Sequence, residues 1–587
     1  MRLFILVLYL CLQMLQAQTI PVERSIDWQK SGCNFVFPFN WIQVSVADFG
    51  AIPNDSNDDI AAFQAAITSL PASGGIIFIP AGIWDLSATL TLPDSIILQG
   101  AGTDSVLLLI NHSNNGISVN GSAISPFYPI TNGYTKGSFF IICDSAHLFI
   151  AGDNVEIHQT NGNWDISPAT WATYSVGQIN RVLSVSGDSI FLEDALNISY
   201  ENVLNPEIRR INSTNCVSMG CFSMERTEAN IAGTSYNISF NFAHNCRVHG
   251  IGSNKSQGSH VMIAASSHIS IERCYFHDAY MYDGTGTKGY GVTLNNHATL
   301  CRIENNIFNH LRHAMMTKHG ANGNVFGYNY STNPYRNGDF EFPSDYCGDI
   351  SLHGHFSFAN LFEGNVVQNI MIDDYWGPSG PYNTFFRNKI EYYGFIMSSA
   401  TTDTSNIVGN EIAGSGYSFP FTLGAYVLTG NGNFAWGNNC NGVINPSGTT
   451  TLTGASMYRT TEPHFWIPGL SWPALGLPNT IGANQIPSET NALSGNFATC
   501  NDTLYVTQLT DANMALSVYP NPAQSEVNIF SNKAFSNISI YDMRGKLLYS
   551  EELQTETQQA HFRIPEGMHG LVLLKADSQK SIMFIEK

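Results

Sequence analysis

The sequence is poor in charge. Only 12% of its 587 residues are Asp, Glu, Lys or Arg, and the formal net charge is −20. No segment is rich in Lys and Arg, so the chain lacks the counter-charge that a general binder of nucleic acid or of an anionic membrane needs. An acidic sugar polymer is not excluded, because one locally basic groove can outweigh a distant acidic surface. With 51 glycines and 12% aromatic residues, the composition is typical of an extracellular β-rich protein.

Cysteine is also scarce for a secreted chain of this length. The 11 cysteines are too few to indicate a disulfide scaffold. No CxxC pair and no zinc-type spacing of Cys and His occurs, so we do not expect a structural zinc site. Cys246, Cys274 and Cys301 lie in apolar runs, where we expect buried free thiols.

Long apolar runs are missing except at the N-terminus, which reads MRLFILVLYLCLQMLQA. One Arg, an apolar stretch and a small residue at Ala17 predict a secretory signal over residues 1–17. The stretch is shorter than the roughly 20 residues that a bilayer span needs. We therefore predict a secreted or surface-attached protein without a transmembrane span.

What is present is a repeat over residues 236–442, in which an Asn recurs within a short apolar run. The recurring residues are Asn306, Asn329, Asn365, Asn388, Asn410 and Asn438. Their spacings are 23, 36, 23, 22 and 28 residues, so one unit has about 22 residues and some units carry insertions. A repeat of this length predicts a solenoid whose units bury their apolar faces only by stacking on one another.

Residues 44–110 carry a compact pattern ahead of the repeat. It contains DFGA, an acidic run before AAFQAAI, the strand GGIIFIPAG and the turn ILQGAG. This pattern resembles the N-terminal cap of the pectate-lyase-like superfamily. The resemblance implies an all-β fold over residues 18–500, a right-handed parallel β-helix with an N-terminal helical cap. It leaves the activity open, because the superfamily includes lyases, glycosidases, epimerases and phage tailspikes.

Two further segments depart from the repeat. Residues 150–200 alternate apolar and polar positions around a Gly-Asp turn, which predicts a small antiparallel insertion that could form one wall of a cleft. After a linker at 501–515, residues 516–587 predict a small C-terminal β-sandwich. Its YPNP, IYDMRGKLL and final β run resemble the C-terminal sorting domain of the type IX secretion system of Bacteroidetes. That resemblance implies the type IX machinery as a partner; a carbohydrate-binding module is the alternative.

One strand of each coil concentrates polar residues. Six segments align by an inward apolar pair: Val261/Ile263, Val292/Leu294, Ala314/Met316, Ile350/Leu352, Ile370/Ile372 and Phe395/Met397. Side chains alternate across a strand and neighbouring coils lie about 4.8 Å apart, so residues of one outward row touch. The alignment predicts that His313 neighbours Asp349 and that His353 neighbours Asp373. It also predicts a turn row of His297, His319, His355 and Tyr375, with Lys318, Arg312 and Asp374 beside it.

These residue types suit more than one reaction. A β-elimination on a uronic-acid polymer needs a base and a cation, while hydrolysis of a glycosidic bond needs two carboxylates. The surplus of His and cations favours elimination, by a polysaccharide lyase. Hydrolysis would use Asp349 and Asp373, with Asp374 and Asp339 in reserve. The predicted catalytic residues are His319, His355, Lys318, Arg312, Asp349 and Asp373.

The remaining predictions concern binding. The residues expected to bind an extracellular polysaccharide are His297, His313, His353, Tyr375, Trp376 and Tyr335. A transition metal held by His319, His353, His355 and Asp373 is an alternative, and so is Ca²⁺ held by Asp349 and Asp373. We expect a monomer. A glycoside hydrolase, a uronate epimerase and a non-catalytic glycan-binding surface protein remain the other possibilities.

Overall fold

The computed structural model describes most of the chain. The described residues are 20–35, 41–227, 234–283, 286–336, 348–373, 375–397, 404–413, 432–452, 454–500, 516–519, 526–542, 547–564, 570–576 and 579–585. The predicted signal peptide, the linker, Asp339 and Asp374 lie outside them. The chain divides into two compact units, Met1–Cys500 and Asn501–Lys587, with the boundary at the start of the predicted linker. Among the described residues, no helix has the length and apolar character to cross a membrane.

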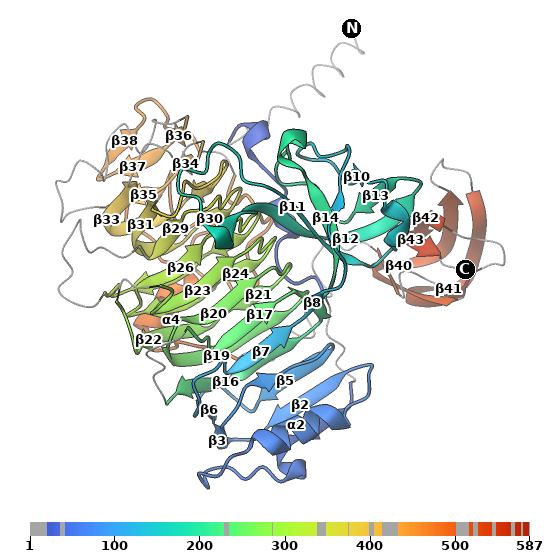
Figure 1. Cartoon of the computed structure of the whole chain (residues 1–587), viewed down its shortest axis with the longest axis horizontal. Coiled ribbons are helices and arrows are strands. Elements are labelled where there is room, and N and C mark those ends of the chain that lie inside the picture. Colours follow the sequence, from blue (N-terminus) through green and yellow to red (C-terminus); the bar gives the residue numbers. More distant parts are fainter. Residues whose placement is uncertain are drawn as a thin grey trace. The chain divides into compact units, whose positions relative to one another are not determined.

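The first unit is the predicted right-handed parallel β-helix, and its coils stack into three parallel sheets (Figure 1). Sheet 1 contains β1 (Gln43–Ser45), β2 (Gly75–Ile79), β5 (Ile96–Gly100), the first parts of β16 (Ser218–Arg226) and β19 (Arg247–Ser256), β21 (Ser270–Glu272), β24 (Arg302–Glu304), β27 (Val325–Gly327), β30 (Leu361–Glu363), β32 (Thr384–Phe386), β34 (Asn406–Val408) and β36 (Phe434–Trp436).

Sheet 2 follows sheet 1 in each coil. It contains β3 (Gly82–Leu86), β6 (Val106–Ile110), the second parts of β16 and β19, β22 (Tyr275–Ala279), β25 (Ile307–Asn309), β28 (Tyr330–Thr332), the first parts of β31 (Val366–Asp373) and β33 (Lys389–Met397), β35 (Glu411–Ile412) and β37 (Asn438–Cys440), which β38 (Val443–Asn445) closes.

Sheet 3 completes the coil. It contains β4 (Leu90–Thr91), β7 (Ile117–Asn120), β17 (Ile238–Asn241), β20 (Ser259–Ala264), β23 (Tyr290–Asn295), β26 (His313–Thr317), β29 (Ile350–His353) and the second parts of β31 and β33. Between the sheets, β15 (Thr214–Asn215) pairs with β18 (Ala243–His244). Apolar side chains from all three sheets fill the inside of the stack, as in a solenoid.

The repeated Asn residues form a ladder, but the ladder lies at a bend and not inside a strand. Asn306 lies between β24 and β25, so each Asn-marked run is two short strands and not the single strand that we predicted. Its Nδ2 donates to Asn329 Oδ1 at 3.0 Å, and Asn329 donates to Asn365 at 2.9 Å. The same Nδ2 also donates to the backbone oxygen of Ile271. Asn suits this bend because its amide satisfies backbone groups that turn out of the sheets.

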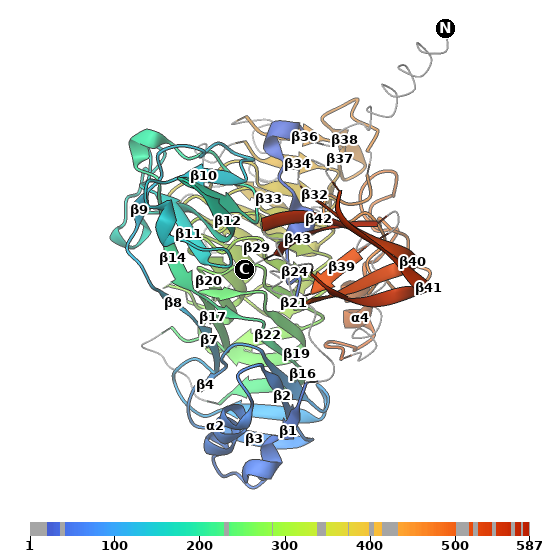
Figure 2. The ribbon, with the colours of Figure 1, turned by 90° about the vertical axis from the view of Figure 1, so that its right-hand side faces the viewer.

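The cap closes one end of the stack, as the sequence predicts. Helix α2 (Ile60–Ser69) buries Ile60, Phe63 and Ala66 against the first coil (Figure 2). The acidic residues before it hold the turn: Asp59 accepts backbone N–H groups of Ile52 and Asp85.

The insertion is larger than predicted and has its own apolar core. It is an antiparallel assembly of β8 (Ser122–Ala123), β9 (Tyr128–Pro129), β10 (Phe140–Ile142), β11 (Asn154–Gln159), β12 (Val176–Ser186), β13 (Ser189–Leu192) and β14 (Glu207–Asn212). It leaves the helix after β7 and returns before β16, so it lies beside the turns that follow sheet 3 (Figure 2). Its Glu156 and Tyr174 contact His297 in one of those turns.

The end of the first unit forms an irregular C-terminal covering over sheet 1. Residues 454–500 include α4 (Pro487–Leu493) and pack Tyr458, Trp466 and Ile486 against the outer face of the coils. A disulfide between Cys221 and Cys500 ties the last residue of this covering to β16. The predicted free thiols at Cys246, Cys274 and Cys301 are free and buried.

The second unit is antiparallel. Its described residues form a five-stranded sheet of β39 (Leu516–Tyr519), β40 (Glu526–Asp542), β41 (Leu547–Arg563), β42 (Gly570–Ala576) and β43 (Gln579–Ile585). Shifts of register within the long β40–β41 pair bend the sheet, and its core includes Val527, Ile540 and Phe562.

Candidate functional site

Three polar side chains follow one another on the outward side of sheet 3. Strand pairing aligns His353 with Asp373, and it aligns Thr317, which precedes Lys318, with Leu352, which precedes His353. Lys318, His353 and Asp373 therefore occupy one row in three successive coils, and we call them the sheet 3 row. Neighbouring residues of such a row are about 4.8 Å apart along the stack.

The predicted register is correct except in β26, where it slips by one residue. Met315, not Ala314, pairs with Val292 and with Ile350. Thr317 therefore faces the core, and Lys318 takes the row position that we had given to Thr317. His313 pairs with Tyr290 instead of sharing a row with Asp349. A slip of one residue exchanges the two faces of a strand, so this shift decides which polar side chain enters the row.

His353 and Asp373 form a hydrogen-bonded pair. His353 Nδ1 lies 2.5 Å from Asp373 Oδ2, and Asp373 Oδ1 accepts the backbone N–H of Tyr375 at 3.2 Å. The pair fixes the imidazole plane and leaves Nε2 as the ring nitrogen for a substrate. The predicted contact between these two residues is confirmed.

Lys318 stands next in the row with a perturbed ammonium group. Its Nζ donates to Thr287 Oγ1 at 3.2 Å. Burial lowers the pKa of Lys318 to about 8, because the charged form is poorly solvated there. A lysine with this pKa is partly neutral near physiological pH and can accept a proton.

Behind the row lies a layer of buried groups. The His313 ring is 5.7 Å from that of His353, and its Nδ1 donates to the backbone oxygen of Gly348 at 3.0 Å. Burial keeps the pKa of His313 well below its ordinary value, so the ring is neutral. Arg312 stacks on Tyr290 at 5.3 Å and donates to the backbone oxygens of Asp283 and Gly286. It is buried there, so the structure gives Arg312 an anchoring position and not the predicted open catalytic one.

The predicted turn row is present but roofed by the insertion. His297, His319 and His355 all have left-handed backbone angles, and the rings of His297 and His319 are 5.9 Å apart. His297 Nδ1 lies 2.9 Å from Glu156 Oε1, and its Nε2 donates to the backbone oxygen of Tyr174. His355 is fully buried, with Nε2 3.8 Å from Asp165.

The insertion buries His355, whereas His297 and His319 still line a pocket of about 310 Å³. Burial, reinforced by His297 and His355, lowers the pKa of His319 to about 3, and burial also lowers that of His355. A base with so low a pKa takes up a proton poorly at neutral pH. The sequence could not show the roof, because it comes from residues more than 100 positions earlier.

Asp349, another predicted catalytic residue, is buried and does not reach the surface beside the sheet 3 row. It is 1% exposed, and its carboxylate accepts Ser331 Oγ at 2.8 Å and the backbone N–H of Gln368 at 2.6 Å. Burial raises its pKa to about 6. The structure therefore does not place Asp349 at an open surface as the predicted pair with Asp373 for hydrolysis requires. Within the described residues, no group of three or more His, Cys, Asp or Glu side chains is placed to hold a metal ion.

Exposed aromatic rings flank the row. Tyr375 and Trp376, both predicted to bind substrate, are 74% and 40% exposed and lie 4.9 Å apart. Trp171 of the insertion, which the sequence did not single out, is 50% exposed and lies 6.2 Å from Trp376. Its ring covers His355 edge-on at 4.8 Å. Tyr335 contacts Tyr282 and His310 instead, so it lies outside this group, which we call the aromatic platform (Trp171, Tyr375 and Trp376).

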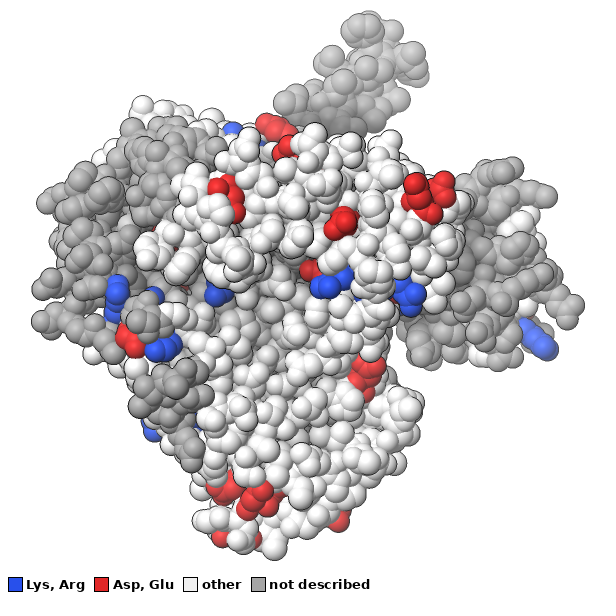
Figure 3. Space-filling model, viewed as in Figure 1, with Lys and Arg blue, Asp and Glu red and all other residues white. Residues whose placement is uncertain are grey.

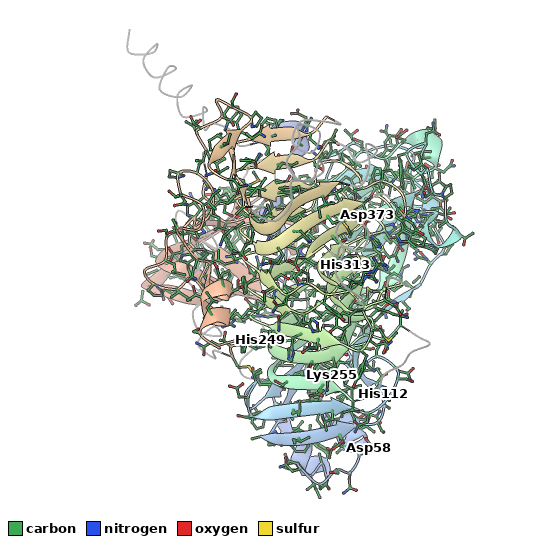
Figure 4. All side chains as sticks on the ribbon, turned by 90° about the vertical axis from the view of Figure 1, so that its left-hand side faces the viewer. Asp58, His112, His249, Lys255, His313 and Asp373 are labelled. Carbon is green, nitrogen blue, oxygen red and sulfur yellow. A yellow bond between two sulfur atoms is a disulfide. The ribbon has the colours of Figure 1, made fainter. Side chains whose placement is uncertain are left out.

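The figures place the site on the later coils. Figure 4 shows Asp373 above His313 in the stacked strands, two coils apart by strand pairing, with Lys255 lower and Asp58 at the cap. In the view of Figure 3, charged side chains at the cap end are Asp and Glu, whereas Lys and Arg of the first unit appear higher, interspersed with further Asp and Glu.

Comparison with known families agrees with the fold. The profile of the family described as rhamnogalacturonase A/epimerase, pectate lyase-like, matches residues 43–205, and that of the secretion system C-terminal sorting domain matches residues 517–587. The N-terminal part of this chain is thus pectate-lyase-like, and its C-terminal part is a type IX sorting domain. Both predicted resemblances are confirmed, and the sorting domain makes it a secreted or cell-surface protein. The first match ends before the sheet 3 row begins, so it assigns no role to the row.

Curated relatives share parts of this pectate-lyase-like chain. The pre-neck appendage protein of Bacillus phage B103 is 23% identical over 409 residues, which are 66% of this chain and 40% of that protein. The mannuronan C5-epimerase AlgE4 of Azotobacter vinelandii is 39% identical over 83 residues, 13% of this chain and 15% of that one. The chain therefore matches less than half of the length of either relative.

Several solved structures are similar to part of this chain. The tailspike gp61 of Pseudomonas phage phi297 is 15% identical, with a TM-score of 0.43 and 64% of each chain covered. The surface adhesin PfbA of Streptococcus pneumoniae is 12% identical, with a TM-score of 0.34, 63% of this chain covered and 85% of that one.

Proposed function

We propose that the protein is a secreted enzyme that cleaves an extracellular uronic-acid polysaccharide by β-elimination, with the sheet 3 row as its active site. The observation that carries this proposal is Lys318, a base with a pKa of about 8, in one outward row with the hydrogen-bonded pair His353 and Asp373. These are the groups that proton transfer at a carbon next to a carboxylate requires.

The reaction assigns one step to each member of the row. Neutral Lys318 removes the proton α to the uronate carboxylate, and that C–H electron pair becomes a carbon–carbon double bond. The glycosidic oxygen on the β carbon leaves with the electrons of its C–O bond. His353, oriented through Nδ1 by Asp373, gives a proton from Nε2 to the leaving oxygen. The carboxylate of Asp373 stabilises the imidazolium before that transfer.

The aromatic platform serves sugar binding. Trp171, Tyr375 and Trp376 present exposed faces and edges beside Asp373, and an aromatic face packs well against the C–H groups of a sugar ring. Trp171 comes from the insertion, whereas Tyr375 and Trp376 follow β31. The insertion therefore supplies one side of the proposed sugar-binding surface.

Epimerisation is the second candidate, because it begins with the same proton abstraction. Two mannuronan C5-epimerases of Azotobacter vinelandii, AlgE4 and AlgE6, are 39% and 36% identical to this chain over 83 and 99 residues. In that reaction a proton would return to the same carbon from the opposite face, and the chain would stay intact. Hydrolysis is less well supported, since the described groove residues do not assemble the pair of carboxylates that it uses.

Incubation with polygalacturonate, alginate and glucuronan in D₂O separates these reactions. Elimination predicts unsaturated ends that absorb in the ultraviolet, with a rate that rises with pH until Lys318 is deprotonated above about pH 8. Deuterium at the α carbon without cleavage would indicate epimerisation. Reducing ends without ultraviolet absorbance would indicate hydrolysis, and binding without any product would indicate a surface adhesin. Any of the last three outcomes contradicts the lyase proposal.

A further inference from the structure

A second pocket lies on the outward side of sheet 2, in the earlier coils. Its volume is about 320 Å³, and its walls come from β6, β16, β19, β22 and the end of the C-terminal covering. The residues that matter for recognition are Asp104, Glu225, Asn254, Tyr275, His277 and Phe497. None of them belongs to the sheet 3 row or to the aromatic platform.

A stack of three rings forms one side of this pocket. Phe497 lies 4.6 Å from Tyr275, and Tyr275 lies 4.3 Å from His277, with interplanar angles of 21° and 16°. Phe497 is 42% exposed, so its ring remains open to a ligand. Gly252 lies in the floor of the pocket, where no larger residue fits easily. A Cβ at this position would lie only 2.7 Å from Ser223 Oγ. A concave site with an open aromatic surface suits the C–H face of a sugar ring.

The charged side chains that line the pocket are carboxylates. Glu225 accepts Lys255 Nζ at 2.6 Å and Asn254 Nδ2 at 3.1 Å, and Asp104 is exposed at the rim. Beyond His277, Asp278 adds a third carboxylate, 2.9 Å from His277 Nδ1. Three carboxylates against one lysine disfavour an anionic sugar, whereas neutral hydroxyl groups can donate to carboxylate oxygens.

The wall that carries Phe497 is held in place before any ligand arrives. The disulfide Cys221–Cys500 joins this segment to β16, and Thr499 donates its backbone N–H to Arg273. Gly250 permits the close approach, because a Cβ there would lie 2.8 Å from the backbone oxygen of Thr499. A preformed wall reduces the ordering entropy that binding costs.

We infer that this pocket is a second carbohydrate-binding site, specific for a neutral sugar chain and independent of the catalytic groove. The exposed ring of Phe497, backed by Tyr275, stacks on the sugar, and Asp104 and Glu225 accept its hydroxyl groups. The inference holds whichever reaction the sheet 3 row performs, because it uses a different sheet and the opposite charge.

Isothermal titration of the full chain with cellohexaose, mannohexaose and hexagalacturonate tests the inference. We expect the wild type to bind at least one of the two neutral hexasaccharides, and Phe497→Ala to weaken that binding by about tenfold or more. Phe140→Ala is the matched control, since Phe140 is also 42% exposed but lies on the insertion. It should leave the affinity unchanged.

A second variant tests whether weaker binding in Phe497→Ala comes from a lost sugar contact or from a disturbed pocket wall. Glu225→Gln keeps the shape of the side chain but removes its charge, and we expect it to weaken neutral binding while thermal unfolding changes little. The inference is overturned if the wild type binds neither neutral hexasaccharide, if Phe497→Ala binds as tightly as Phe140→Ala, or if only hexagalacturonate responds to these variants.

Discussion

Two outward faces of this β-helix carry ladders of ionisable side chains. On sheet 1 the register places Glu272 beside Glu304, with Glu363 two coils further on. On sheet 3 the corresponding ladder is Lys318, His353 and Asp373. The first ladder is covered by residues 454–500, whereas Lys318 and His353 of the second are partly exposed and Asp373 precedes the exposed rings of Tyr375 and Trp376.

The covered ladder is compensated from outside its own sheet. Arg459 of the covering segment donates to Glu304 at 2.5 Å, and Arg302 lies 2.9 Å from the same carboxylate. Burial alone would raise the pKa of Glu304, but the two guanidinium groups outweigh burial and hold the pKa below its ordinary value. Lys318 differs, because burial alone governs its pKa. Glu304 is thus an ion-paired structural residue, whereas Lys318 has a lowered pKa without an ion-pair partner among its causes, as is typical of a catalytic base.

The largest effect should follow from removing the base of the open ladder. Lys318→Ala should lower kcat/KM for the cleaved polymer by about 10²- to 10⁴-fold, the range typical of a general base. Its thermal unfolding should stay close to that of the wild type. Lys255→Ala is the control, because Lys255 is also an outward lysine but is paired with Glu225 on sheet 2. Full activity in Lys318→Ala would remove the sheet 3 row as the active site.

Breaking the covered ladder should act on stability instead. Arg459→Ala leaves the buried Glu304 short of one cation and should lower the free energy of unfolding by roughly 3–5 kcal/mol. Arg181→Ala, which breaks an exposed pair with Glu193, should cost less than about 1 kcal/mol. Denaturant unfolding measures both. Equal losses in the two variants would contradict the distinction between the ladders.

The covered ladder also predicts a dependence of stability on pH. Burial raises the pKa of Glu363 to about 7, although Tyr328 Oη and the backbone N–H of Met457 donate to it. The folded state therefore binds this proton more tightly than the unfolded chain, whose carboxyl titrates near about 4.3. Its contribution to stability is complete below about pH 4 and is lost as pH rises through about 7.

Glu363→Gln tests this dependence, because the amide keeps the shape without the titration. Between about pH 4 and pH 7, the wild type should lose of the order of 2 kcal/mol relative to the variant. Unfolding curves measured across that range would show parallel profiles for the two proteins if Glu363 did not contribute.

The smallest effect concerns the rim of the open ladder. Trp171→Ala removes the ring that the insertion contributes to the aromatic platform, and it should raise KM by roughly fivefold to tenfold with little change in kcat. Phe140→Ala, on the same insertion but outside the platform, should leave both constants unchanged. An unchanged KM in Trp171→Ala would limit the insertion to a structural role.

The sequence predicted much of the fold because its signals are local or periodic. The Asn ladder, the cap helix and the sorting domain each depend on residues close in sequence or repeated at one spacing. The row of His353 and Asp373 was predicted for the same reason. The register of β26 was not, because Ala314, Met315 and Met316 are all compatible with the core and no contrast marks the inward positions.

Two features of the outward faces could be seen only in the tertiary structure. The insertion covers His297 and His355 from a distance of more than 100 residues, and the C-terminal covering neutralises Glu304 from 155 residues away. Local sequence determined that each strand presents polar side chains outward, since alternation along a strand needs only neighbouring residues. Which of those faces stays open depended on contacts between distant segments, and that selection turned the ladder of Lys318, His353 and Asp373 into the candidate active site.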